Sequence, residues 1–271
     1  MPFKTPVRTA LQEHPTSWGF WLTVANSTVA RTLLASSKTA PDGGFSWVLV
    51  DAEHGLIADN HYYDLNQAVS SMNASPIIRI PWGEEWMIKR ALDSGAHGIL
   101  VPMCHTPEDA AKIVKYCKYP PTGTRGYGPL YSTHAFSELS AAEYDAGADK
   151  ELVIGVQIES QSGVDNVEAI AKVDGLDMLL IGPFDLALQM GVTRFGPDHE
   201  AAIERIRKAA KDAGKIAAIF CTTGEQAKMR ADQGFDMVSV ITDVGLLGEA
   251  MARELNNAKG KGASGEKRAG Y

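Results

Sequence analysis

The chain has 271 residues, of which 45% are hydrophobic and 22% charged, and its formal net charge is −7. It contains no apolar run of about eighteen residues that could cross a bilayer and no basic stripe for phosphates, so neither a membrane protein nor a nucleic-acid binder is expected. The first residues lack the apolar core of a secretory signal, which favours a cytoplasmic location. Cys104, Cys117 and Cys221 lie far apart, which argues against a disulfide framework or a zinc site.

A helical stretch, a glycine and a short apolar run recur along the chain, as in GGFSWVLVDA and SGAHGILVPM. Glycine suits the left-handed turn that ends a helix, and short apolar runs suit strands buried on both faces of a parallel sheet. Eight strands are predicted, at residues 18–24, 47–50, 76–80, 97–102, 152–158, 178–182, 215–220 and 236–241. Eight alternating units predict a single-domain (β/α)8 TIM barrel, with a doubly wound open sheet as the alternative.

The clearest helix runs from Thr106 to Lys118, because Thr106 can cap it and Pro107 takes the first helical position. Two stretches fall outside the repeat. Residues 119–151 are predicted to form a long Pro/Gly-rich loop followed by a polar piece that can be helical, and Arg125 in this loop could lean over the site. The barrel is expected to span residues 1–255, and the polar residues 256–271 are expected to form a flexible tail.

Polar residues stand at the carboxyl ends of several predicted strands. In a barrel these ends point into one mouth, where barrel enzymes keep their active sites. The candidates at these ends are Asp51, Glu53, His54, Arg79, Gln157, Glu159, Gly182, Pro183, Phe184 and Asp185.

Glu159 and Asp185 follow neighbouring predicted strands. Two carboxylates with open positions around them are what a hard cation such as Mg²⁺ or Mn²⁺ needs. Either carboxylate alone is more often a helix N-cap or a partner of the helix dipole. Their joint position beside Arg79 and His54 favours a metal site.

Arg79 interrupts an otherwise apolar strand, PIIRI. A structural salt bridge is one reading, and a clamp for a carboxylate or an enolate oxygen is the other. His54 fits either an ordinary loop histidine or a general base whose tautomer Asp51 fixes. Trp21, at the end of the first predicted strand, fits packing as well as a wall of the site.

The chain resembles the HpcH/HpaI aldolase family in five collinear motifs, from about Trp18 to Leu247: WVLVDAEHG, RALDSGAHGILVPM, KYPPTGTRGYG, VQIESQSGVDNVEAI and LLIGPFDLALQMG. The resemblance implies a (β/α)8 barrel and a homo-oligomer, usually a hexamer with an exchanged C-terminal helix. It also implies a class II aldolase that uses a divalent cation (Mg²⁺, Mn²⁺ or Co²⁺) and cleaves 4-hydroxy-2-oxo acids to pyruvate and an aldehyde.

The resemblance assigns roles position by position. The metal-binding acids match Glu159 and Asp185, the pyruvate-binding arginine matches Arg79, and an Asp–His pair matches Asp51 and His54. The pyruvate pocket is expected to be lined by Gln157, Gly182, Pro183, Phe184 and Trp21, and Asp93 is expected near a subunit contact.

The implied reaction is a reversible retro-aldol cleavage through a metal-stabilised pyruvate enolate. Arg79 is expected to hold the enolate oxygen, and His54, oriented by Asp51, to take the C4 hydroxyl proton. The substrate is expected to be a 2-keto-3-deoxy sugar acid or a compound of the 4-hydroxy-2-oxoheptanedioate type. No second basic residue can be placed for a distal carboxylate, which favours a neutral hydroxyaldehyde product over succinic semialdehyde.

Three other functions stay open. Oxaloacetate decarboxylation by the same metal and arginine is the first alternative. A phosphate-binding isomerase is less favoured because the predicted ends of the last two strands carry one glycine each. A non-enzymatic binding protein is the third.

The chain also departs from the family's usual GPADLS motif, since Phe184 and Ala187 stand where alanine and serine are common.

Overall fold

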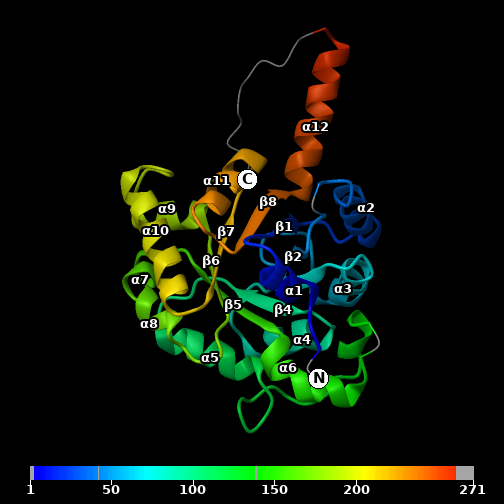
Figure 1. The fold of residues 1–271 in the computed structure, drawn as a ribbon, viewed down its shortest axis with the longest axis vertical. Coiled ribbons are helices and arrows are strands. Elements are labelled where there is room, and N and C mark those ends of the chain that lie inside the picture. Colours follow the sequence, from blue (N-terminus) through cyan, green and yellow to red (C-terminus); the bar gives the residue numbers. More distant parts are fainter. Residues whose placement is uncertain (1–2, 42, 138, 261–271) are drawn as a thin grey trace.

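The computed structural model describes residues 3–41, 43–137 and 139–260. Its strands are all parallel, and each pairs with the next until the last closes on the first (Figure 1). They are β1 (Ser17–Leu22), β2 (Trp47–Asp51), β3 (Ser75–Arg79), β4 (Gly98–Val101), β5 (Val153–Ile158), β6 (Met178–Ile181), β7 (Ile216–Phe220) and β8 (Met237–Thr242). The predicted (β/α)8 barrel is confirmed, and the open sheet is not observed among the described residues.

Helices surround this barrel (Figure 1). They are α1 (Pro6–Glu13), α2 (Ser27–Ser37), α3 (Tyr62–Ser70), α4 (Glu85–Asp93), α5 (Pro107–Cys117), α6 (Ala141–Glu151), α7 (Gln161–Asp165), α8 (Val167–Ala171), α9 (Pro183–Met190), α10 (Pro197–Asp212), α11 (Gly224–Asp232) and α12 (Asp243–Ala258), with short 3₁₀ helices η1 (Asp59–His61) and η2 (Ser132–Ala135). Helix α5 begins as predicted: the Thr106 hydroxyl accepts from the Asp109 amide, and proline opens the first turn. Each described helix is too short or too polar to cross a lipid bilayer.

The barrel interior is a packed core of apolar side chains. Trp47 lies fully buried in it, and a Cβ on Gly19 of the adjacent strand would overlap the Trp47 ring. The missing side chain at Gly19 therefore makes room for the large one. At the amino-terminal end, Val7 of α1 belongs to the same apolar cluster, and its amide donates to the Ser75 hydroxyl over 2.9 Å.

The segment between α5 and β5 packs at the amino-terminal end of the barrel. Its Ala135 carbonyl lies 2.8 Å from His97 Nε2, just before β4 begins. Arg125 is buried, bonds Asp93 over 2.6 Å and stacks over the Tyr119 ring at 4.5 Å. Arg125 therefore does not lean over the mouth of its own barrel, and that expectation is wrong. The physical reason is that α5 carries the chain away from the carboxyl ends of the strands.

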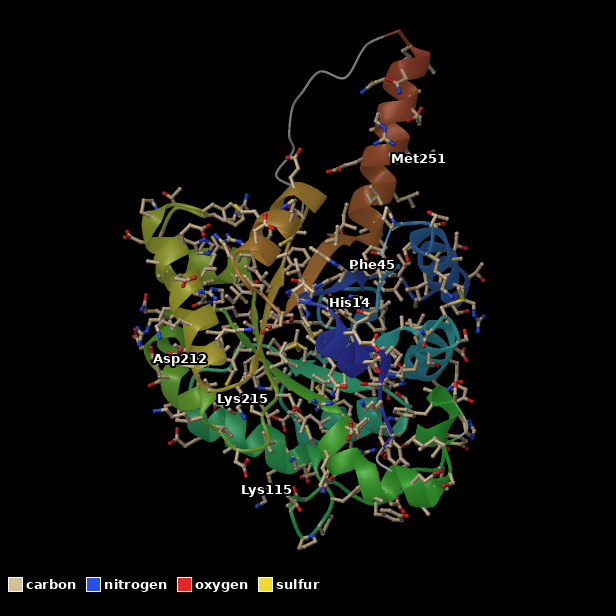
Figure 2. The ribbon with its side chains drawn as sticks, viewed as in Figure 1. His14, Phe45, Lys115, Asp212, Lys215 and Met251 are labelled. Carbon is tan, nitrogen blue, oxygen red and sulfur yellow. The ribbon has the colours of Figure 1, made fainter. Side chains whose placement is uncertain are left out.

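Helix α12 projects away from the barrel (Figure 1), and Met251 points out from it (Figure 2). Its large exposed apolar side chains are Val244, Leu246, Leu247, Met251 and Leu255. The helix continues to Ala258, so the first three residues of the predicted flexible tail are helical. Residues 261–271 of that tail lie outside the described residues.

Candidate active site

A cavity of about 180 Å³ opens at the carboxyl ends of the strands. Its lining residues are Trp21, Thr23, Asp51, His54, Arg79, Gln157, Gly182, Pro183, Phe184, Asp185, Phe220, Thr242 and Val244. Every strand-end candidate except Glu53 and Glu159 thus lines this cavity. Glu53 contacts Arg79, and Glu159 lies against Gly182. Phe220 and Thr242 were not predicted, although each ends a strand and the same positional rule would have found them. No feature of the sequence singled out Thr23 or Val244 as a residue of the site.

Strand register places Asp51 beside Arg79, as direct partners across β2 and β3. Arg79 Nε and Nη2 donate to the two Asp51 carboxylate oxygens over 2.9 and 2.7 Å. Arg79 Nη1 lies 2.8 Å from a Glu53 carboxylate oxygen and 3.5 Å from the Gln157 carbonyl oxygen. The guanidinium carbon also sits 4.3 Å from the Trp21 ring centroid. Arg79 is therefore held rigidly, and both readings of it from the sequence apply, because it forms a buried salt bridge and also lines the cavity.

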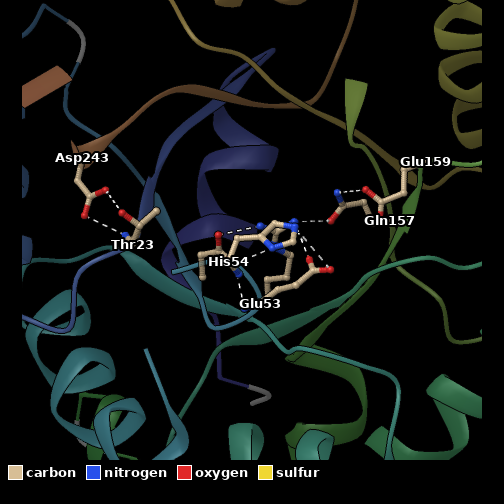
Figure 3. A network of polar contacts seen from close by, with 8 residues as sticks. Thr23, Glu53, His54, Gln157, Glu159 and Asp243 are labelled. Carbon is tan, nitrogen blue, oxygen red and sulfur yellow. Dashed lines mark hydrogen bonds and ion pairs between the residues drawn. The ribbon is translucent and has the colours of Figure 1, made fainter. Parts of the chain in front are cut away.

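Asp51 has partners that the sequence did not predict. Besides binding Arg79, Asp51 Oδ1 accepts from the backbone amides of Glu53 and His54 over 3.1 and 3.3 Å. Asp51 thus fixes the turn that carries His54, and the carboxylate 3.9 Å from His54 Nε2 belongs to Glu53 (Figure 3). The physical reason is the register between β2 and β3, which places Asp51 next to the Arg79 guanidinium. The local sequence does not reveal this partner.

Glu159 is buried and closely held (Figure 3). One carboxylate oxygen accepts from the Met103 amide over 2.9 Å, and the other from the Gln157 side-chain amide. Met103 adopts a left-handed backbone with φ of 54°, rare for a residue with a side chain, and this turn aims its amide at Glu159. Burial raises the pKa of the Glu159 carboxyl to about 7, and the nearby Glu53 and Asp185 act in the same direction.

The residues present fit a divalent cation. In the part of the chain that the structure describes, no three His, Cys, Asp or Glu side chains cluster as a closed metal site. Glu159 and Asp185 instead offer two carboxylates, the set with which Mg²⁺ is commonly bound when water and substrate complete its coordination. A Cβ on Gly182 would overlap a Glu159 oxygen and the Gln157 amide, so this glycine lets the backbone of the cavity wall lie directly against the Glu159 carboxylate. A buried carboxylate with a raised pKa also favours a neighbouring cation.

Fold and site together define an enzyme of the (β/α)8-barrel class, with an acidic mouth and one deeply held arginine at the carboxyl ends of its strands. A sequence model of the HpcH/HpaI aldolase/citrate lyase family matches residues 18–250. The chain belongs to this family, and the expected resemblance is confirmed. It is an aldolase, a carbon–carbon lyase, and the family implies a divalent metal cofactor in general.

The chain is similar to the hydroxypyruvate/pyruvate aldolase of Roseobacter denitrificans, with 37% identity over 88% of this chain and 91% of the relative. It is 34% identical to the 5-keto-4-deoxy-D-glucarate aldolase of Klebsiella pneumoniae, over 92% of this chain and 94% of that protein. Among solved structures it is similar to an HpcH/HpaI aldolase/citrate lyase family protein of Burkholderia cenocepacia. That match has a TM-score of 0.84 and 29% identity and covers 94% of this chain and 100% of the other.

Proposed function

We propose that the protein is a class II pyruvate-dependent aldolase that cleaves 4-hydroxy-2-oxo acids to pyruvate and an aldehyde. The observation that carries the proposal is the single cavity in which Arg79 and Asp185 meet, with the Glu159 carboxylate just beneath Gly182. Relatives named for hydroxypyruvate or pyruvate and for 5-keto-4-deoxy-D-glucarate support this substrate class.

Glu159 and Asp185 would hold the cation, for which Mg²⁺, Mn²⁺ and Co²⁺ are the candidates. When bound, the cation supplies Lewis acidity to the 2-oxo carbonyl. Gln157 orients Glu159 through its side-chain amide, and the Met103 amide holds the second oxygen of the same carboxylate.

Arg79 stabilises charge on the enolate oxygen. It donates hydrogen bonds to Asp51 and Gln157 and forms an ion pair with Glu53. Because two carboxylates and the Trp21 face already fix the guanidinium, no reorganisation is needed as charge develops. One such donor is worth about 2.7–4 kcal/mol in the transition state.

His54 is the proposed base for the C4 hydroxyl group. As it takes this proton, the C3–C4 bond breaks, the C4 oxygen becomes the aldehyde oxygen, and the bond's electron pair passes to the pyruvate enolate. The enolate then gains a proton at C3 and becomes pyruvate. The Glu53 carboxylate, 3.9 Å from His54 Nε2, stabilises the protonated imidazole.

Decarboxylation of oxaloacetate is the second candidate, because it produces the same pyruvate enolate and uses the same arginine. The two reactions differ in their need for His54: decarboxylation releases carbon dioxide without removing a hydroxyl proton. Loss of His54 should therefore lower aldol cleavage and leave decarboxylation nearly unchanged.

We also propose a homo-oligomer, with a hexamer as the expectation from the family. The support is the stripe of exposed apolar side chains along the projecting helix α12. A cytoplasmic location and the limits of the barrel domain at residues 1–255 stay predictions from the sequence.

The test is exchange of the pyruvate methyl protons with deuterium in heavy water, followed by NMR, together with cleavage of 4-hydroxy-2-oxo acids. Both reactions should stop with EDTA and return with Mn²⁺, Mg²⁺ or Co²⁺. His54→Ala should keep a trace of cleavage, since general-base catalysis supplies about 10²–10⁴-fold. Exchange that survives complete removal of metal, or covalent trapping of pyruvate by borohydride, would contradict a class II mechanism.

A further inference from the structure

Arg194 packs against a residue that lines the cavity and takes no part in the reaction described above. It belongs to the connection between α9 and α10, and its guanidinium carbon sits 4.3 Å from the Phe184 ring centroid. Phe184 lines the cavity and packs edge-on against Phe220, another lining residue, with ring centroids 5.9 Å apart. Arg194 therefore covers an aromatic wall of the active site.

Every other arginine in the described ranges forms a hydrogen bond or an ion pair with the chain. These are Arg8, Arg31, Arg79, Arg90, Arg125, Arg205, Arg207, Arg230 and Arg253. Within the described part of the chain, Arg194 contacts the Phe184 and Phe195 rings and forms no hydrogen bond or ion pair. A guanidinium stacked by its face keeps its N–H edge available, and this edge matches the two oxygens of a carboxylate.

The connection that presents Arg194 is anchored. Phe195, the next residue, has a left-handed backbone with φ of 60°, which residues other than glycine rarely adopt. Its amide donates to His199 Nδ1 over 3.0 Å, and the two rings lie 5.7 Å apart. His199 is fully buried, and burial lowers its pKa, which keeps the ring neutral and able to accept this bond. The turn therefore has a defined shape that holds Arg194 next to Phe184.

The charges around the cavity bear on the role of Arg194. Arg79 already faces Asp51 and Glu53, so it has little charge left for a second anionic group on a substrate. Among the described residues that line the cavity, Arg79 is the only lysine or arginine. Arg194 places a further positive charge against the ring of Phe184, which does line the cavity.

We propose that Arg194 is a specificity-determining residue that binds the terminal carboxylate of the aldehyde half of the substrate. The preferred substrates are then 4-hydroxy-2-oxo diacids, and the aldehyde product carries a carboxylate. This inference rests on the proposed aldolase function and deepens it. It also replaces the expectation of a neutral hydroxyaldehyde, which depended on finding no second basic residue.

The experiment compares matched substrates. The diacids 4-hydroxy-2-oxopentanedioate, -hexanedioate and -heptanedioate are each paired with an analogue whose terminal carboxylate is a primary alcohol. The variants are Arg194→Gln, Arg194→Lys and, as a control with the same loss of charge, Arg205→Gln, which lies on the outer face of α10 beside Glu168. Pyruvate release gives kcat and KM, and deuterium exchange of pyruvate reports the pyruvate half of the site alone.

Arg194→Gln should lower kcat/KM for the best diacid by about tenfold to a hundredfold, mainly through KM, as for loss of a hydrogen bond to a charged group. Arg194→Lys should recover part of this loss. The alcohol analogues, the Arg205→Gln variant and pyruvate exchange in every variant should stay within about twofold of the original protein.

Equal losses on diacids and alcohols, or no loss on either, would overturn the inference. If the unaltered protein does not exchange the pyruvate methyl protons at all, the proposed function fails, and this outcome is separate from any effect of Arg194.

Discussion

At Gly182 the backbone passes directly over the Glu159 carboxylate and the Gln157 amide. In Gly182→Ala the added methyl group would overlap both side chains. Neither side chain can move away, because Glu159 accepts a hydrogen bond from the Met103 amide and Gln157 donates one to Glu159. We expect this variant to lose pyruvate exchange and to bind Mn²⁺ at least about tenfold more weakly, measured by NMR and calorimetry.

Gly224→Ala is the matched control, since a Cβ there meets nothing within 4 Å. It should exchange pyruvate normally. A Gly182→Ala protein with unchanged Mn²⁺ affinity would show that Glu159 does not hold the cation.

Residue roles could be predicted only where position alone decides them. The rule that polar strand ends meet at one mouth found Arg79 and Asp185 without any coordinates. The partner of Asp51 depends on the register between β2 and β3, which no local pattern encodes. Arg194 was missed because it lies in a connection and owes its position to the left-handed turn at Phe195.

The strands and α5 were predicted within about two residues, because buried runs and capping residues are local signals. In the segment from 119 to 151, the long loop and the helical piece after it were predicted, and α6 is that piece. The position of Arg125 was wrong, although the direction of α5 already carries the chain to the amino-terminal end of the barrel.

His97 ties this segment to β4 and makes the fold sensitive to acid. Its Nε2 lies 2.8 Å from the Ala135 carbonyl and its Nδ1 lies 3.1 Å from the Ser75 hydroxyl, so the buried ring is satisfied when neutral. Burial lowers the pKa of His97 to about 4, whereas a free histidine titrates near 6.5. The unfolded chain therefore binds a proton first as the pH falls. The stabilisation that neutral His97 gives to the folded state is fully present above about pH 6.5 and is lost as the pH drops through 4.

Between pH 7 and pH 5, the free energy of unfolding should fall by about 2 kcal/mol less in His97→Gln than in the original protein. Urea unfolding at the two pH values measures this difference. His14→Gln, at an exposed position visible in Figure 2, should keep the original pH dependence. A His97→Gln protein with the same loss as the original would contradict the assignment.

For the whole molecule, the exposed stripe of α12 predicts association. Met251 is 68% exposed and Leu247 is 64% exposed, more than a helix usually leaves to water on its apolar face. The double change Leu247→Glu and Met251→Glu should lower the molar mass measured by light scattering. Asn256→Glu, on the same helix, should leave the mass unchanged. A protein that is monomeric before any substitution would remove the basis of the proposal.

The first turn of α12 is also a wall of the cavity. Asp243 accepts from the Thr23 amide and hydroxyl over 2.9 and 2.6 Å (Figure 3). Thr23, Thr242 and Val244 all line the active site. The helix that carries the exposed apolar stripe therefore begins at the active site. If the protein associates through α12, as proposed, its specific activity should change with protein concentration in dilute solution.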